Sequence, residues 1–172
     1  MEYCFDYKRR QEFIKFLDEA RRACYLDDGS DQFKVKAPRK KGHTEYRYTD
    51  GDWTYMDSYS GSIQSWGQEL VWYEGNLYWS MSYGGSVNID IFPQNASVKK
   101  IKELIISCLK LALSEKKDES EFQPRGKRIC KVDNLIYECL WKGDEGNFVG
   151  HETITLQNAV LFHHDFFGGF FK

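Results

Sequence analysis

The chain contains 172 residues, of which 41% are hydrophobic, 16% are aromatic and 29% are charged, and its formal net charge is −2. This length suits a single domain over residues 1–172. The aromatic content predicts a core, or the lining of a cavity, built from large rings. The nearly balanced charge excludes a strong general attraction to DNA or to an anionic membrane.

The cysteines and the N-terminal residues indicate a cytoplasmic protein. None of the cysteines forms a CxxC pair, and the start MEYCFDYKRRQEF lacks the apolar run of a signal peptide. We therefore expect reduced thiols, no metal site and no cofactor. The longest apolar run, near residues 101–113, contains Lys110 and is too short to cross a bilayer. The cysteines are Cys4, Cys24, Cys108, Cys130 and Cys139.

The first half of the chain begins with a predicted helix and continues with strands. Apolar residues recur at helical spacing from Lys8 to Cys24, and the turn signal DDG follows at Asp27. Residues 30–44 are polar and basic, which indicates a solvated connector or, as an alternative, an anion-binding patch. Strands are expected over residues 46–48, 53–59, 63–74 and 77–83, with a two-residue hairpin turn at Gly75 and Asn76.

The second half repeats this order. We expect a helix over residues 97–114 with Ser97 as its cap, a charged loop over residues 115–128, and strands near 135–141, 148–156 and 159–167. The basic runs KVKAPRKK and RGKRICK are loop-like and lack regularly spaced aromatic residues. We therefore expect no nucleic-acid partner.

Four short sequence words, two in each half, occur in the same order and suggest an internal duplication. WGQE in the first half matches VGHE in the second, and SYGG matches FFGG. Tyr55 precedes Glu69 by 14 residues, and Tyr137 precedes Glu152 by 15. We predict an α+β fold in which two pseudo-symmetric α-βββ halves, about 8–85 and 97–170, form one antiparallel sheet with both helices on one face.

The same residues resemble a known family. The motifs YxDSYxG, GxExVW and WxMxYxG, with the helix FLDEARRACY and the ending FFGGFFK, are similar to DUF5680, a bacterial domain family of unknown function. The resemblance implies a domain that occurs alone or behind a helix-turn-helix segment, which associates it with transcription regulators. It implies no activity. This chain shows no helix-turn-helix segment, so direct DNA binding is not expected.

Two acids lie inside aromatic strands, and the hairpin register offers an explanation. A turn at Gly75 and Asn76 pairs Glu69 with Ser82 and places Leu70, Trp72 and Met81 on a core face. Glu69 then lies on the opposite face among small residues, and Asp57 joins it beside Tyr55 and Tyr59. We expect a concave acidic and aromatic site, away from the helices, for an organic cation or another small polar ligand. Its predicted residues are Tyr55, Asp57, Tyr59, Glu69, Ser82, Tyr83, Trp141, Glu152 and His163.

This interpretation predicts a ligand-binding or sensory module. At the level of fold only, its architecture resembles the effector-binding domains of drug-sensing transcription regulators.

Several alternatives remain open. The acids are scaffolding if they pair with lysine or arginine across strands. An enzyme could use Glu69 or Glu152 as general acid or base. A metal site at FHHDFF is disfavoured because adjacent histidines point to opposite faces. The apolar ending FFGGFFK also fits a protein-interaction module or a homo-oligomer.

Overall fold

The computed structural model describes residues 7–26, 30–93, 95–114 and 121–171. Its two long helices end close to the predicted positions. They are α1 (Tyr7–Tyr25) and α2 (Val98–Ser114), and two short 3-10 helices, η1 (Ser30–Phe33) and η2 (Ile89–Ile91), lie in the connections. The strands are β1 (Thr44–Asp50), β2 (Trp53–Gly61), β3 (Gln64–Tyr73), β4 (Asn76–Val87), β5 (Ile129–Val132), β6 (Leu135–Asp144), β7 (Asn147–Leu156) and β8 (Ala159–Phe170).

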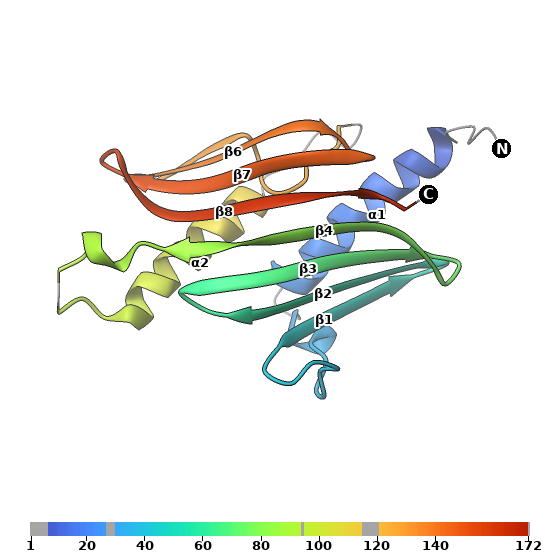
Figure 1. Cartoon of the computed structure of the whole chain (residues 1–172), viewed down its shortest axis with the longest axis horizontal. Coiled ribbons are helices and arrows are strands. Elements are labelled where there is room, and N and C mark those ends of the chain that lie inside the picture. The colour runs from blue at the N-terminus through green and yellow to red at the C-terminus, as the bar shows by residue number, and fades with distance from the viewer. Residues whose placement is uncertain (1–6, 27–29, 94, 115–120, 172) are drawn as a thin grey trace.

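All eight strands form one antiparallel sheet in the order β1-β2-β3-β4-β8-β7-β6-β5 (Figure 1). The predicted α+β class with an antiparallel sheet is confirmed. The first half contains the four strands expected there, whereas the second half contains four in place of the expected three, so the α-βββ description is wrong in its number of strands. Strand β5 was missed since it has only four residues, Ile129–Val132, and directly follows a charged segment.

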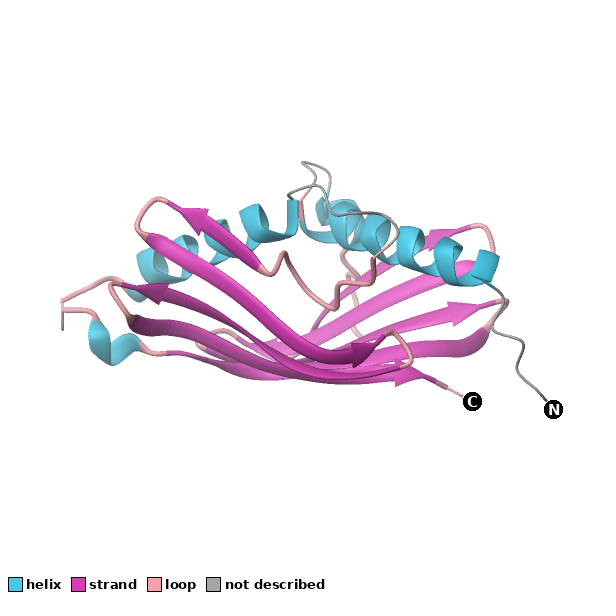
Figure 2. Cartoon of the chain, turned by 90° about the horizontal axis from the view of Figure 1, so that it is seen from above, coloured by secondary structure: helices cyan, strands magenta, loops and turns pink. Residues whose placement is uncertain are grey.

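One face of the sheet, the inner face, carries buried side chains such as Tyr55, Val71, Trp79 and Phe166. Figure 2 shows α1 and α2 along this side of the sheet. Helix α1 buries its predicted stripe, and Phe13 lies at the centre of an aromatic cluster with ring centroids 5.4–6.0 Å away. Its neighbours are Trp53, Tyr78, Trp79 and Phe170. The core is therefore built from large rings, as the composition indicates.

The observed register of β3 and β4 overturns the predicted assignment of faces. The two-residue turn consists of Glu74 and Gly75, with φ of 49° and 76°, and a bulge lies between Val71 and Trp72. Glu69 consequently faces Met81 and not Ser82. It belongs to the buried inner face, while Leu70, Trp72 and Leu77 belong to the outer face. The predicted outer-face acidic site is wrong, because a slip of one residue exchanges the two faces of a strand.

Strands β7 and β8 form a second hairpin with the same register. Its turn residues Gln157 and Asn158 also have positive φ, 48° and 70°, and its bulge lies between Ile154 and Thr155. The bulges at Val71 and Ile154 are 83 residues apart, as are Glu69 and Glu152 (154 − 71 and 152 − 69). With this spacing, the counterpart of Gly84 is Phe167 and not Gly168, which corrects the alignment suggested by the words SYGG and FFGG.

Cys24, Cys108, Cys130 and Cys139 are all buried, whereas Cys4 lies outside the described residues. Burial raises the pKa of the Cys24 thiol to about 12 and that of Cys108 to about 11. Such thiols carry almost no thiolate near neutral pH, so they suit a packing role better than a nucleophilic one. None of the described helices is both long enough and apolar enough to cross a membrane.

Candidate functional site

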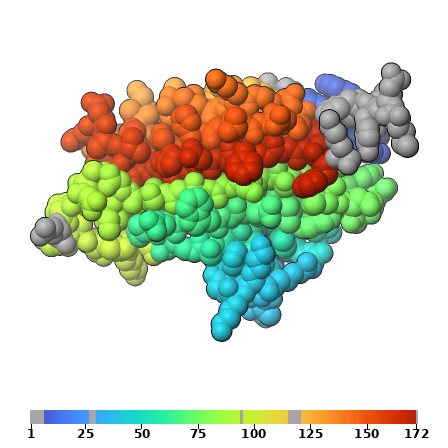
Figure 3. All heavy atoms as spheres, in the orientation of Figure 1, coloured from blue at the N-terminus to red at the C-terminus, as the bar shows by residue number. Residues whose placement is uncertain are grey.

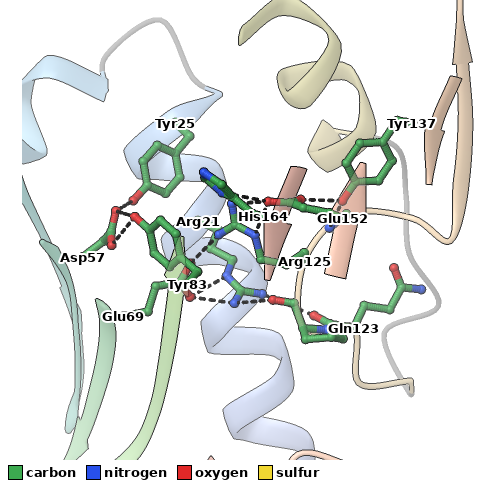
Figure 4. Close-up of polar contacts among 12 residues, drawn as sticks. Arg21, Tyr25, Asp57, Glu69, Tyr83, Gln123, Arg125, Tyr137, Glu152 and His164 are labelled. Atoms are coloured by element: carbon green, nitrogen blue, oxygen red, sulfur yellow. Dashed lines mark hydrogen bonds and ion pairs between the residues drawn. The ribbon is translucent and has the colours of Figure 1, made fainter. Parts of the chain in front are cut away.

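The sequence-predicted acids meet in a polar network buried on the inner face. Asp57 comes from β2, Glu69 from β3 and Glu152 from β7, and each is only 1% exposed. Figure 4 shows their partners converging from helix α1, from the connection between α2 and β5, and from the sheet. The network therefore joins both halves of the sheet to the helix layer. Its main members are Arg21, Tyr25, Asp57, Glu69, Tyr83, Arg125, Tyr137, Glu152 and His164.

Glu69 is held by two arginines. Arg21 of α1 donates to Oε2 from Nε at 3.0 Å and from Nη2 at 2.6 Å, and Arg125 donates to Oε1 at 3.2 Å. Burial acts to lower the pKa of Arg21, but Glu69, together with Tyr55, outweighs this effect and raises that pKa. Both oxygens of Glu69 are thus compensated by charge-assisted hydrogen bonds, which a buried carboxylate requires.

Arg125 also bridges to the other half of the sheet. It donates to Glu152 Oε1 from Nε at 3.0 Å and from Nη2 at 2.9 Å, and its guanidinium lies 4.8 Å from the centre of the Tyr83 ring. Glu152 further accepts from Tyr137 at 2.8 Å and lies 3.5 Å from His164 Nδ1. Burial alone would raise the pKa of Glu152, but Arg125 and His164 outweigh it and lower that pKa to about 2. Glu152 is therefore ionised at neutral pH and is poorly suited to act as a general acid.

The segment that carries Arg125, residues 121–126, covers the network. Arg21 donates to the backbone carbonyls of Gln123 at 3.3 Å and Pro124 at 2.8 Å. The backbone N–H of Gly126 donates to the Tyr137 hydroxyl at 3.1 Å. These hydrogen bonds hold the segment against α1 through Arg21 and against β6 through Tyr137. A movement of the segment would therefore change the contacts of α1.

Asp57 has a different environment from the two glutamates. It accepts hydrogen bonds from Tyr25 of α1 and from Tyr83 of β4, the latter at 2.9 Å to Oδ1. Among the described residues no lysine or arginine forms a salt bridge with it. Burial and the neighbouring charge of Glu69 raise the pKa of Asp57 to about 7, although both tyrosines favour the ionised form. With a pKa of about 7, Asp57 is partly protonated near neutral pH.

The charges of the network do not balance. Three carboxylates face two guanidiniums, and Asp57 is the carboxylate that has no salt bridge to lysine or arginine among the described residues, although the nearby charge of Arg125 acts to lower its pKa. The hydroxyl of Tyr55, which is fully buried, also has no hydrogen-bond partner among the described residues. Asp57 is therefore the carboxylate of this network that is held by tyrosine hydroxyls and not by a guanidinium.

The structure divides the predicted site residues between the two faces. Ser82 and His163 lie on the outer face, where His163 pairs with Asp165 at 3.2 Å. The next residue, His164, takes the inward position beside Glu152 because side chains alternate along a strand. Trp141 lies inward but away from the network, under the guanidinium of Arg128 at 3.9 Å. The inward residues are Tyr55, Asp57, Tyr59, Glu69, Tyr83, Trp141 and Glu152.

The comparisons with known proteins concern the same part of the chain. The profile of a family described as "Domain of unknown function (DUF5680)" matches residues 57–171. The chain belongs to the DUF5680 family. No curated protein and no solved structure matches this DUF5680 chain. The matched residues include Asp57, Glu69, Arg125 and Glu152, while Arg21 and Tyr25 of α1 precede them.

A glycine beside the network gives a test of its packing. A Cβ atom on Gly67 would lie 2.4 Å from the Tyr83 hydroxyl and 2.8 Å from Tyr59 Cβ. We expect Gly67→Ala in the DUF5680 chain to displace Tyr83 from Asp57 and to lower the free energy of unfolding by about 1 to 3 kcal/mol, measured by urea denaturation. Gly84→Ala is the control, because the three atoms nearest to its Cβ all belong to the ring of Trp66, which is 64% exposed and has room to move. Equal losses in the two variants would contradict the prediction.

Proposed function

We propose that this chain is a cytoplasmic sensory module that binds a small organic cation on the inner face of the sheet. The supporting observation is the surplus carboxylate: Asp57 is buried, receives hydrogen bonds only from tyrosines among the described residues, and lies beside Glu69. A cation with an apolar part fits this position, because tyrosine rings attract a positive charge and exclude water from it. At neutral pH such a cation would compete with the proton that Asp57 binds.

Arg125 suggests how a ligand gains access to the site. Its guanidinium already occupies the space between Glu69 and Glu152, and it reaches that space from a segment that is not part of the sheet. A cationic ligand could replace or displace this guanidinium without leaving either glutamate uncompensated. Segment 121–126 would then lose its hold on Arg21, and the change would reach helix α1. This coupling is the reason for proposing a sensor rather than a simple binding protein.

We also propose that the domain arose by duplication of an α-ββββ unit, over about residues 8–85 and 97–170, with both helices packed on one face. The equal registers and equally placed bulges of the β3–β4 and β7–β8 hairpins support this interpretation. Glu69 and Glu152 are then equivalent residues, and a single arginine, Arg125, bridges them. Arg125 joins the two units, and the proposed ligand site at Asp57 lies beside it within the first unit.

A thermal-shift screen of the full chain tests the cation proposal. The probes are agmatine, phenethylamine, putrescine and choline, and at least one should raise the melting temperature in proportion to its concentration, since a ligand at 100 times its Kd adds about 2.7 kcal/mol of stability. Asp57→Asn should abolish the shift. The control variant Asp50→Asn removes an exposed carboxylate of β1 and should retain it. The proposal fails if no probe stabilises the native chain, or if the shift persists in Asp57→Asn.

A further inference from the structure

A concave site lies on the outer face of the sheet, the face that does not carry the buried network. It is a cavity of about 240 Å³ over strands β1 to β3, on the side of the sheet that faces the viewer in Figure 3. Two arginines and an indole contribute to its wall. The lining residues are Arg39, Arg47, Thr54, Met56, Trp72 and Gly75.

The strand registers bring the floor of this cavity together. Arg47 of β1 is directly opposite Met56 of β2, and Thr54 is directly opposite Trp72 of β3. These residues point outward because their neighbours, such as Tyr55, point into the core. The floor is therefore a strip of apolar and aromatic surface with a guanidinium at one side.

Arg39 reaches the cavity from the loop before β1, and a buried acid fixes that loop. Glu45, 3% exposed, accepts the backbone N–H of Arg39 at 3.1 Å and the hydroxyl of Ser58 at 3.4 Å. His43 Nδ1 lies 3.0 Å from the same hydroxyl, and the N–H of Val35 donates to the Glu45 carbonyl at 2.8 Å. The loop is thus held by Glu45 through its backbone, and the guanidinium of Arg39 is left for the cavity.

Within the described residues, neither guanidinium of this cavity is neutralised by a carboxylate. Arg39 and Arg47 are both exposed, and neither takes part in a salt bridge within the described part of the chain. The cavity lining contains no carboxylate. Two like charges on one small concave surface repel each other, and an anion between them removes that cost. Guanidinium forks bind carboxylate and phosphate groups bidentately, and they do so better than lysine.

We propose that this cavity binds a small aromatic anion, a single ring carrying a carboxylate or a phosphate. The anionic group would lie between Arg39 and Arg47, and the ring would stack on Trp72 and contact Met56. The cavity volume of about 240 Å³ lies below the usual range for drug-sized ligands, which favours a single ring with its acidic group. This site is separate from the cation site proposed above and does not depend on it.

Calorimetric titration of the full chain at low salt tests the proposal with benzoate and phenyl phosphate as probes. At least one should bind, and Arg39→Gln or Arg47→Gln should each weaken it by about tenfold or more. Lys41→Gln removes the same charge from the same loop outside the cavity lining, so it should change the affinity less than about twofold. Trp72→Leu should weaken the aromatic probes but leave the weaker binding of inorganic phosphate unchanged. Because these side chains are exposed or half-buried, unchanged melting temperatures would show that the variants fold.

Three results would overturn this assignment. The first is no heat of binding for either aromatic probe with the native chain at millimolar concentration. The second is an equal loss in Lys41→Gln, which would mean attraction by the general charge of the loop. The third is inorganic phosphate or neutral benzyl alcohol binding as tightly as phenyl phosphate, because the proposal requires the ring and the charge together.

Discussion

Replacing Arg125 by methionine should lower the free energy of unfolding at pH 7 by about 3 to 5 kcal/mol. Arg125 is 12% exposed and contacts two carboxylates that are each 1% exposed. Methionine fills a similar volume but leaves Glu152 with Tyr137 and His164 alone, and leaves Glu69 with Arg21 alone. The free energy of unfolding falls because two buried carboxylates lose the guanidinium that compensates their negative charge. Urea denaturation followed by tryptophan fluorescence measures it.

Two further variants separate this cause from lost packing. Arg9→Met makes the same change at an exposed position of α1, where the guanidinium lies 4.8 Å from the Tyr73 ring, and should cost less than about 1 kcal/mol. The double variant Arg125→Met with Glu152→Gln should recover part of the loss, since it removes one of the stranded charges. If Arg125→Met is no more harmful than Arg9→Met, the guanidinium does not compensate the glutamates and the network needs another explanation.

The helices and the fold class were predictable because they depend on local patterns. The helical spacing of apolar residues in α1 predicts which of its side chains are buried. Gly75 marks the turn of the β3–β4 hairpin. The register of β3 against β4 was not predictable from such local patterns. Glu74, a residue that rarely adopts positive φ, takes the first turn position, and the bulge after Val71 adds a residue to one strand. The shifted turn and the bulge exchange the two faces of the strand relative to the prediction, so Glu69 lies on the buried face and not on the exposed one.

The sequence analysis did not identify Arg21 or Arg125 as members of the site, although the position of Arg21 in the helix indicates that it is buried. Arg21 follows Leu17 by four residues and precedes Cys24 by three, so it lies on the apolar stripe of α1. A charged residue on a buried stripe implies an opposite charge in the facing layer, and Glu69 of β3 supplies it. Arg125 has no such signal. It comes from an irregular charged segment, and only the tertiary fold brings it between Glu69 and Glu152.

The stability of the chain should depend on pH through two carboxylates of the network that act in opposite directions. The folded chain raises the pKa of Asp57 from 3.8 to about 7, because of burial and of the charge of Glu69. Between these values the folded state binds a proton that the unfolded state releases. The free energy of unfolding should therefore fall as pH rises from about 4 to about 7, with a slope of at most about 1.4 kcal/mol per pH unit.

Glu152 has the reverse effect at lower pH. Its pKa is lowered from 4.5 to about 2 by Arg125 and His164, in spite of burial. In that range the unfolded state binds the additional proton, so stability rises with pH from about 2 to about 4.5. The two contributions together predict a maximum of stability near pH 4 to 5, below neutrality. Equilibrium urea denaturation at a series of pH values would locate this maximum.

Conservative variants assign each side of the maximum to its residue. Asp57→Asn keeps the shape of the side chain and cannot ionise, so it should flatten the decline between pH 4 and 7 and make the chain more stable than the native one at pH 7. Glu152→Gln should flatten the rise below pH 4.5 and leave the decline in place. Exposed Asp50→Asn should change neither slope, since its side chain lies outside the network. A decline that survives in Asp57→Asn would mean that another group titrates there, and Asp57 would then be ionised at neutral pH without a compensating cation.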